Sequence, residues 1–133
     1  MQKEIPGIIF PETKSIELSM LPIRFPIVGR WKPTIQDILD LEKRLDEYLK
    51  SSKHPQASRI RNRISSYKRQ YVGYLEDKRR LVYVNALSGD YTGRNEKWRH
   101  EYIWVKDGGS NFFQAIYDYN SGRIEWFHVN SES

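Results

Sequence analysis

The three histidines of the chain, His54, His100 and His128, are the side chains best suited to proton transfer near neutral pH. A histidine beside a carboxylate is the minimum arrangement for general acid–base catalysis, and Glu101 and Glu125 lie close in sequence to His100 and His128. Alternation along a strand, however, directs each glutamate away from the face that carries its neighbouring histidine. No serine lies in the elbow motif of a catalytic triad. We therefore expect no catalytic residue, and a hydrolase or isomerase built on His100 or His128 is the least favoured function.

Metal and cofactor chemistry has equally little support in the residue types. The chain has no cysteine, which excludes thiol catalysis, cysteine-bound zinc, iron–sulfur clusters and disulfides. Two possible histidine ligands without a zinc motif or an acidic calcium loop leave no ligand set at a workable spacing. Asp107-Gly108-Gly109 lacks the helix and lysine of a phosphate loop, so we interpret it as a hairpin turn. We expect no metal ion and no cofactor.

Alternation along the C-terminal strands sorts their side chains onto two faces. The set expected to pack against a helix is Phe113, Ala115, Tyr117, Phe127 and Val129, joined by Ile103 and Val105. The other set, called here the aromatic face, is Phe112, Gln114, Ile116, Trp126 and His128, joined by His100, Tyr102 and Trp104.

The aromatic face is the candidate site for a ligand or partner. Trp and Tyr offer apolar area with a polar group attached, and their mixture with Gln and His is typical of a partly open surface. The residues expected to make the contact are Tyr102, Trp104, Gln114, Trp126 and His128. The alternative is that the N-terminal segment covers this face and completes a second small core.

Positive charge is concentrated in one stretch of the chain. Residues 50–80 hold ten Lys and Arg against two acidic residues, whereas the whole chain has a net charge of +5. The predicted basic patch is Arg59, Arg61, Arg63, Lys68 and Arg69. Such a patch attracts anionic partners, including nucleic acid. The alternative is a solvated helix face, because no basic–aromatic recognition motif accompanies the charges.

The first regular element predicted to position these residues is a helix that begins after Pro33. Thr34 is a suitable N-cap and Asp37 the acidic partner of a capping box. Apolar residues follow at helical spacing, and the helix is expected to end near Ser51-Ser52, ahead of Pro55. The apolar stripe is Ile38, Leu41, Leu45 and Tyr48/Leu49, with Ile35 at its start. A shorter helix is expected over about residues 56–66.

From Tyr67 onwards the apolar period changes to two, which predicts strands joined by short turns. The expected strands are 68–75, 80–87, 99–106, 112–119 and 123–130. In the last hairpin we expect Ile116 opposite Trp126, Gln114 opposite His128 and Tyr117 near Glu125. The predicted fold class is α+β, with one long N-terminal helix and a short second helix packed on a four- to five-stranded antiparallel meander. The longer connection over residues 88–98 is where binding often occurs.

Residues 1–33 hold five of the six prolines and are expected to lie extended across the domain, with a short edge strand at Ser15–Leu21. Residues 34–133 are expected to form a single α+β domain. No stretch has the roughly 20 apolar residues of a membrane span. As written, the chain is expected in the cytoplasm, or in the periplasm or on a lipid anchor if Met1 replaces a leader. The oligomeric state is left open.

Four short motifs carry a resemblance over about residues 31–130. They are Lys32-Pro33-Thr34, Tyr67-Lys68-Arg69-Gln70-Tyr71-Val72-Gly73-Tyr74, Asp107-Gly108-Gly109 with its following aromatics, and Val129-Asn130. With them the chain resembles a family of small bacterial proteins of uncharacterised function, many of them exported or lipid-anchored. That family implies no activity for any residue. The order of helix and meander also resembles the cystatin-like group, which hosts inhibitors, immunity proteins, pocketed enzymes and pilot domains.

The function expected from these observations is a non-enzymatic binding or protein-interaction domain of a bacterial protein, of the inhibitor or immunity type. Its partner is expected to be another protein that contacts the aromatic face. The alternative is anion or nucleic-acid binding through the basic segment at residues 50–80.

Overall fold

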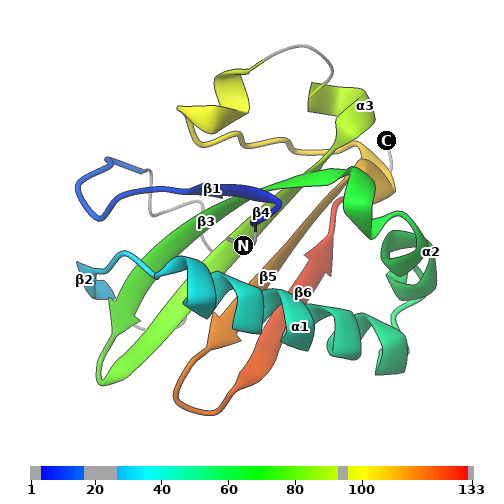
Figure 1. The fold of residues 1–133 in the computed structure, drawn as a ribbon. Coiled ribbons are helices and arrows are strands. Elements are labelled where there is room, and N and C mark those ends of the chain that lie inside the picture. The colour runs from blue at the N-terminus through cyan, green and yellow to red at the C-terminus, as the bar shows by residue number, and fades with distance from the viewer. Residues whose placement is uncertain (1–3, 17–26, 93–95, 132–133) are drawn as a thin grey trace.

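The computed structural model describes residues 4–16, 27–92 and 96–131 of the chain. One main helix, α1 (Ile35–Ser51), lies across one face of a mixed sheet that is largely antiparallel (Figure 1). The predicted α+β class with one main helix is confirmed. No helix in the described ranges has both the length and the apolar character needed to cross a membrane.

The sheet has six strands, and its central part is an antiparallel meander. The strands are β1 (Gly7–Ile9), β2 (Ile27–Arg30), β3 (Tyr67–Glu76), β4 (Arg79–Ser88), β5 (Phe112–Asp118) and β6 (Arg123–Val129). Strands β3 to β6 pair in chain order. Strand β1 pairs in parallel with residues 69–71 of β3, and β2 pairs antiparallel with residues 74–76 of the same strand. The parallel pairing of β1 makes the sheet mixed.

The N-terminal segment therefore supplies two strands that the sequence pattern did not predict. Their shortness explains why: three and four residues are too few to show a period of two. The edge strand predicted at Ser15–Leu21 falls largely on residues 17–26, which lie outside the described ranges.

Helix α1 begins where its capping signals predict. The Thr34 side chain accepts a hydrogen bond from the backbone N–H of Asp37 at 3.0 Å, and the Asp37 carboxylate accepts one from the Thr34 N–H at 2.8 Å. This reciprocal pair is the predicted capping box. The expected second helix is also present, as α2 (Ala57–Asn62) followed by a 3-10 turn over Ile64–Ser66.

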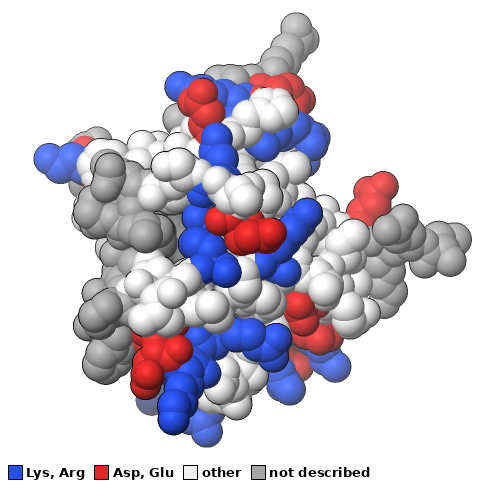
Figure 2. All heavy atoms as spheres, turned by 90° about the vertical axis from the view of Figure 1, so that its left-hand side faces the viewer, with Lys and Arg blue, Asp and Glu red and all other residues white. Residues whose placement is uncertain are grey.

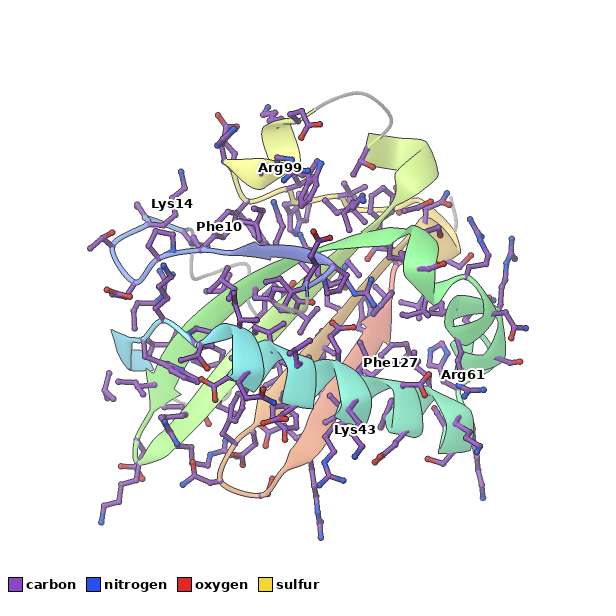
Figure 3. The ribbon with its side chains drawn as sticks, viewed as in Figure 1. Phe10, Lys14, Lys43, Arg61, Arg99 and Phe127 are labelled. Atoms are coloured by element: carbon purple, nitrogen blue, oxygen red, sulfur yellow. The ribbon has the colours of Figure 1, made fainter. Side chains whose placement is uncertain are left out.

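The main core lies between α1 and the sheet. Of the predicted stripe, Ile38, Leu41, Leu45 and Leu49 are fully buried there, whereas Tyr48 is partly buried and Ile35 is 40% exposed. Rings from the helix and the sheet meet, because the centroid of Tyr48 lies 5.6 Å from that of Phe127, which is labelled in Figure 3. The sheet residues predicted for this side that lie in or against this core are Phe113, Ala115, Tyr117, Phe127 and Val129. Ile103 and Val105 were assigned to it wrongly, since both pack against Leu87 and Trp98 on the opposite face.

The hairpin register was correct at two positions of three. Ile116 is paired with Trp126, and Gln114 with His128, as expected. Tyr117 is opposite Ile124 rather than Glu125, because the register shifts between Ile116 and Tyr117, as at a β-bulge.

The N-terminal segment covers part of the sheet face away from α1, which includes Ile116 of the aromatic face. Phe10 is buried there, and its backbone N–H donates to the carbonyl of Tyr71 at 3.0 Å (Figure 3). The residues under this cover are Val72, Tyr74, Leu81, Tyr83 and Ile116. The predicted alternative, in which the N-terminal segment completes a second small core, therefore applies to this part of the sheet face. Residues 98–107 cover the other part.

Residues 99–106 are not a strand, contrary to the prediction. After α3 (Gly89–Thr92) and a 3-10 turn over Lys97–Arg99, the chain runs without regular structure, on the other side of the sheet from α1 (Figure 1). Residues 98–107 are called here the crossing segment. Strand β4 pairs directly with β5 over residues 81–87, so no free edge lies between them for residues 99–106 to join.

The interpretation of Asp107-Gly108-Gly109 as a hairpin turn is wrong for the same reason. A hairpin needs a strand on each side, and here only β5 follows. The glycines instead start a 3-10 turn over Gly109–Asn111, and Gly108 has a φ of +104°, a left-handed value that favours glycine.

Candidate ligand site beneath the crossing segment

A cavity of about 290 Å³ opens between the sheet and the crossing segment. Its lining is Tyr83 and Asn85 from β4, Gln114 from β5, Trp126 and His128 from β6, Asn130, and residues 102–106 of the crossing segment. All five residues predicted for the ligand face, Tyr102, Trp104, Gln114, Trp126 and His128, are among them. The structure thus brings the predicted set together around one space.

Two buried amides hold the first part of the crossing segment. The side-chain NH2 of Gln70 donates to the carbonyls of Trp98, at 2.7 Å, and Glu101, at 2.6 Å. The Gln70 Oε1 accepts from the backbone N–H of Ile103 at 3.1 Å and from the NH2 of Asn85 at 2.9 Å. Asn85 also donates to the Ile103 carbonyl at 2.7 Å. These bonds give buried polar groups of the segment the partners that a strand ladder would otherwise provide.

A second amide pair holds the end of the same segment. The Asn130 NH2 donates to the carbonyls of Val105, at 2.8 Å, and Asp107, at 2.9 Å. The Asn130 Oδ1 accepts from the NH2 of Gln114 at 3.0 Å. The crossing segment is therefore tied to the sheet at both ends, with the cavity under its middle.

The backbone carbonyls fix which way each amide points, because a carbonyl only accepts hydrogen bonds. Gln70, Asn85 and Asn130 must each direct their NH2 towards those carbonyls. Two acceptor atoms then remain, Asn85 Oδ1 and Gln114 Oε1, and neither takes a hydrogen bond from a residue in the described ranges. Asn85 is only 3% exposed and lines the cavity. Gln114 is half-buried and also lines the cavity, so both oxygens are available as acceptors to a ligand there.

Two tyrosine hydroxyls contribute to the cavity from opposite sides. The hydroxyls of Tyr83, on β4, and Tyr102, in the crossing segment, are 3.1 Å apart and share one hydrogen bond. Burial, above all, raises the pKa of both phenols. Both hydroxyls therefore stay protonated near neutral pH and act as hydrogen-bonding groups rather than as bases.

Alkaline pH is expected to destabilise the protein through these buried phenols. Below the ordinary tyrosine pKa of about 10, the phenols are neutral in the folded and unfolded states, so they give the free energy of unfolding no dependence on pH. Above it the unfolded chain loses protons first, so the free energy of unfolding falls as pH rises towards the raised folded pKa. Urea titrations at a series of pH values above about 9 measure this slope. Tyr83→Phe should make the fall of the free energy of unfolding with pH less steep. An unchanged slope would contradict the raised pKa of Tyr83.

The aromatic side chains around the cavity differ in exposure. Trp104 is 53% exposed, whereas Trp126 is partly buried against the core below the N-terminal segment. The rings of Trp126 and His128 are stacked, with centroids 5.6 Å apart and an angle of 13° between their planes. Trp104 thus marks the rim of the cavity, and Trp126 belongs to its wall.

The geometry gives the histidines no acid–base partner at this site. His128 lines the cavity, but none of the described residues that line it is Asp or Glu. His100 is exposed and does not line the cavity. Within the described ranges no group of three or more His, Asp or Glu side chains is arranged to hold a metal ion.

The predicted basic patch does not assemble as one exposed surface. Arg69 is 3% exposed, and its guanidinium binds the Glu42 carboxylate at 2.7 Å inside the protein. Arg61 is paired with Asp46 at 3.1 Å on the helical side (Figure 3). Lys68 lies beside Trp98 in a hollow on the opposite face of β3, which strand alternation requires when its neighbour Arg69 faces α1.

Of the remaining members, Arg59 is exposed and Arg63 is half-buried. Figure 2 shows the face of the molecule opposite α2, where Lys and Arg are interspersed with Asp and Glu. Charge clustering in the sequence therefore overstated the clustering on the surface, since Arg69 is a core residue.

Sequence reasoning missed the amides that shape the site. Asn85 lies among apolar neighbours in the middle of β4, Gln70 lies between Arg69 and Tyr71 within β3, and each is almost fully buried. An amide inside a predicted strand was the available signal of a hydrogen bond to a distant segment, because a buried amide needs a partner that only tertiary structure supplies. Asn130 ends the closing Val129-Asn130 motif, whose role was not apparent without the crossing segment.

Comparison of the chain with protein-family models, with curated proteins and with solved structures gives no match.

Proposed function

We propose that this chain is a non-enzymatic binding domain whose site is the cavity beneath the crossing segment. The observation that carries the proposal is a pair of acceptors without a donor among the described residues, Asn85 Oδ1 and Gln114 Oε1, in a space walled by Trp126 and Tyr83. A concave site with several aromatics and a few placed polar groups is the usual form of a ligand pocket. None of the described lining residues is a carboxylate, and the buried phenols stay protonated, which supports binding rather than acid–base catalysis.

We also propose the class of protein to which this domain belongs. One helix across an antiparallel meander supports a cystatin-like architecture, to which β1 and β2 are additions at the β3 edge. With the motifs shared with small bacterial proteins, this architecture supports an interaction domain of the inhibitor or immunity type. Trp104 and His128, both exposed at the cavity, are the residues that a partner would contact first.

Trp104→Ala is the variant that tests the site with the least damage to the fold. Because the side chain is half exposed, we expect the free energy of unfolding to change by no more than about 1 kcal/mol. Ligand-observed NMR with a library of small neutral compounds should show compounds that bind the native protein and lose that binding in Trp104→Ala.

Val28→Ala is the matched control, because Val28 is 65% exposed and does not line the cavity. It should retain every compound that the native protein binds. A library in which no compound distinguishes Trp104→Ala from Val28→Ala would refute the proposed site. A loss of several kcal/mol in Trp104→Ala would instead assign Trp104 to the core.

The alternative proposal, anion or nucleic-acid binding through residues 50–80, has Arg59 as its exposed cation on α2. Retention of DNA or RNA that falls steeply as salt is raised, and that is lost in Arg59→Ala, would favour it over the cavity. The burial of Arg69 and the separation of Lys68 from the α2 arginines are the reasons for ranking it second.

A further inference from the structure

We infer that the cavity recognises a neutral saccharide ring. The inference rests on the proposed function and narrows it to one chemical class of ligand, which a free sugar or a glycan on a larger partner can present. Four properties of the lining lead to it: its unused hydrogen-bonding groups, its aromatic walls, its charge and its size.

The unused hydrogen-bonding groups are both acceptors and donors. Asn85 Oδ1 and Gln114 Oε1 are acceptors without a partner in the described residues, and one of the two N–H groups of the Gln114 NH2 is also unused. In the hydroxyl pair of Tyr83 and Tyr102, one O–H donates to the other, so the second O–H remains available. A ligand that suits this lining must offer donors and acceptors a few ångströms apart. Each sugar hydroxyl is both.

The aromatic walls suit the apolar faces of a ring. Trp104 comes from the crossing segment and Trp126 from β6, so indoles from two different elements border the same space. Trp126 is held flat against His128 by stacking, which presents a rigid ring at small cost in side-chain entropy. A saccharide ring has hydroxyls around its edge and C–H groups on its faces, and the amides and indoles of the cavity match these two parts.

Charge argues for a neutral ligand. Among the described lining residues Lys106 is the single member of the Lys, Arg, Asp and Glu group, and its exposed side chain disfavours a cation. Two unpartnered carbonyl oxygens disfavour an anion, because their dipoles place negative charge towards it. Recognition would depend on hydrogen bonds and apolar contact, and its affinity should be insensitive to salt.

The size of the cavity points to one ring. A volume of about 290 Å³ lies just below the range of roughly 300–1,000 Å³ found for ligand pockets, which suits a small ligand. Trp104 at the exposed rim offers a contact for a second ring of an oligosaccharide.

The test is an NMR titration of the indole N–H signals of the full chain with D-glucose, D-galactose, N-acetyl-D-glucosamine and maltotriose. We expect at least one sugar to shift the Trp104 and Trp126 signals with an affinity in the millimolar range or tighter. The Trp31 signal is an internal control, since its indole N–H is bonded to the Leu81 carbonyl at 3.0 Å and the residue does not line the cavity.

Gln114→Met removes the amide that faces the cavity and should weaken sugar binding by at least about tenfold, as should Trp104→Ala. Gln36→Met, on the exposed side of α1, should bind the sugar like the native protein. Trp104→Ala keeps the test decisive if Gln114→Met fails to fold. Unchanged affinity in both folded cavity variants would overturn the inference.

Adenosine, N-acetyl-tryptophanamide and inorganic phosphate are the competing probes. If adenosine or N-acetyl-tryptophanamide shifts Trp104 and Trp126 while no sugar does, the saccharide inference fails and the binding site stands. Shifts caused by phosphate alone, lost at high salt, would likewise overturn it. If no probe shifts either signal, the inference and the proposed function both fail.

Discussion

Glu42→Ala is expected to lower the free energy of unfolding by about 3–5 kcal/mol, because it leaves the buried guanidinium of Arg69 without a counter-charge. In the native protein the Glu42 Oε1 accepts from Arg69 at 2.7 Å, and its Oε2 accepts from the Tyr71 hydroxyl at 2.6 Å. Burial of Arg69 at 3% exposure prevents water from replacing the carboxylate. The loss is measured by urea unfolding at neutral pH.

Glu47→Ala on the same helix is the matched control. Its ion pair with Arg44 is about half exposed on both sides, and such pairs contribute little. A change within about 0.5 kcal/mol is expected. Combining Glu42→Leu with Arg69→Met should recover much of the loss, since well-packed apolar side chains replace buried ion pairs without penalty in many proteins. A Glu42→Ala variant as stable as Glu47→Ala would show that the pair is not buried in solution.

Gln70→Leu is expected to release the crossing segment from the sheet. The substitution keeps roughly the same volume but leaves the carbonyls of Trp98 and Glu101 and the N–H of Ile103 without their partner. An unsatisfied buried group costs about 1–3 kcal/mol, so the free energy of unfolding should fall by about 2–4 kcal/mol after the segment relaxes into water. The cavity loses its outer wall at the same time, and every ligand of the site should lose affinity.

Hydrogen exchange distinguishes this local release from a general loss of stability. The Ile103 amide should exchange about 100-fold faster in Gln70→Leu than in the native protein. The exchange rates of amides in the middle of β4 should change only as far as the free energy of global unfolding changes. Gln36→Leu, an exposed substitution of the same type on α1, should leave the exchange of Ile103 unchanged. Equal protection of Ile103 in the two variants would contradict the role assigned to Gln70.

The parts of the fold that the sequence predicted are those set by residues close together in the chain. The capping box joins residues three apart, and the stripe of α1 repeats every three or four residues, so both are readable from a short window. Strands β3 to β6 were found for a similar reason, since alternation within each strand sorts side chains onto two faces. The same alternation placed Gln114, Trp126 and His128 on one side, and they do line one cavity.

Residues 99–106 show where such reasoning fails. Their alternating aromatics fit a strand, but a strand also needs a free edge to pair with, and β4 and β5 already pair with each other. The prediction for Arg69 fails in the same way. Its sequence neighbours suggest a basic patch, whereas in the structure its guanidinium contacts Glu42 and the backbone of Tyr67. In both cases the deciding partners are distant in sequence.

The sequence by itself determined the α+β class, the start and end of α1, the four strands of the meander and the two faces of its last hairpin. Those features follow from local periodicity and capping, whose energies depend on residues within a few positions of each other. Only the tertiary structure decided that the crossing segment covers part of the sheet face away from α1 and that a cavity remains beneath it. The hydrogen bonds responsible join residues as far apart as Gln70 and Ile103, and no local pattern encodes the meeting of two such groups.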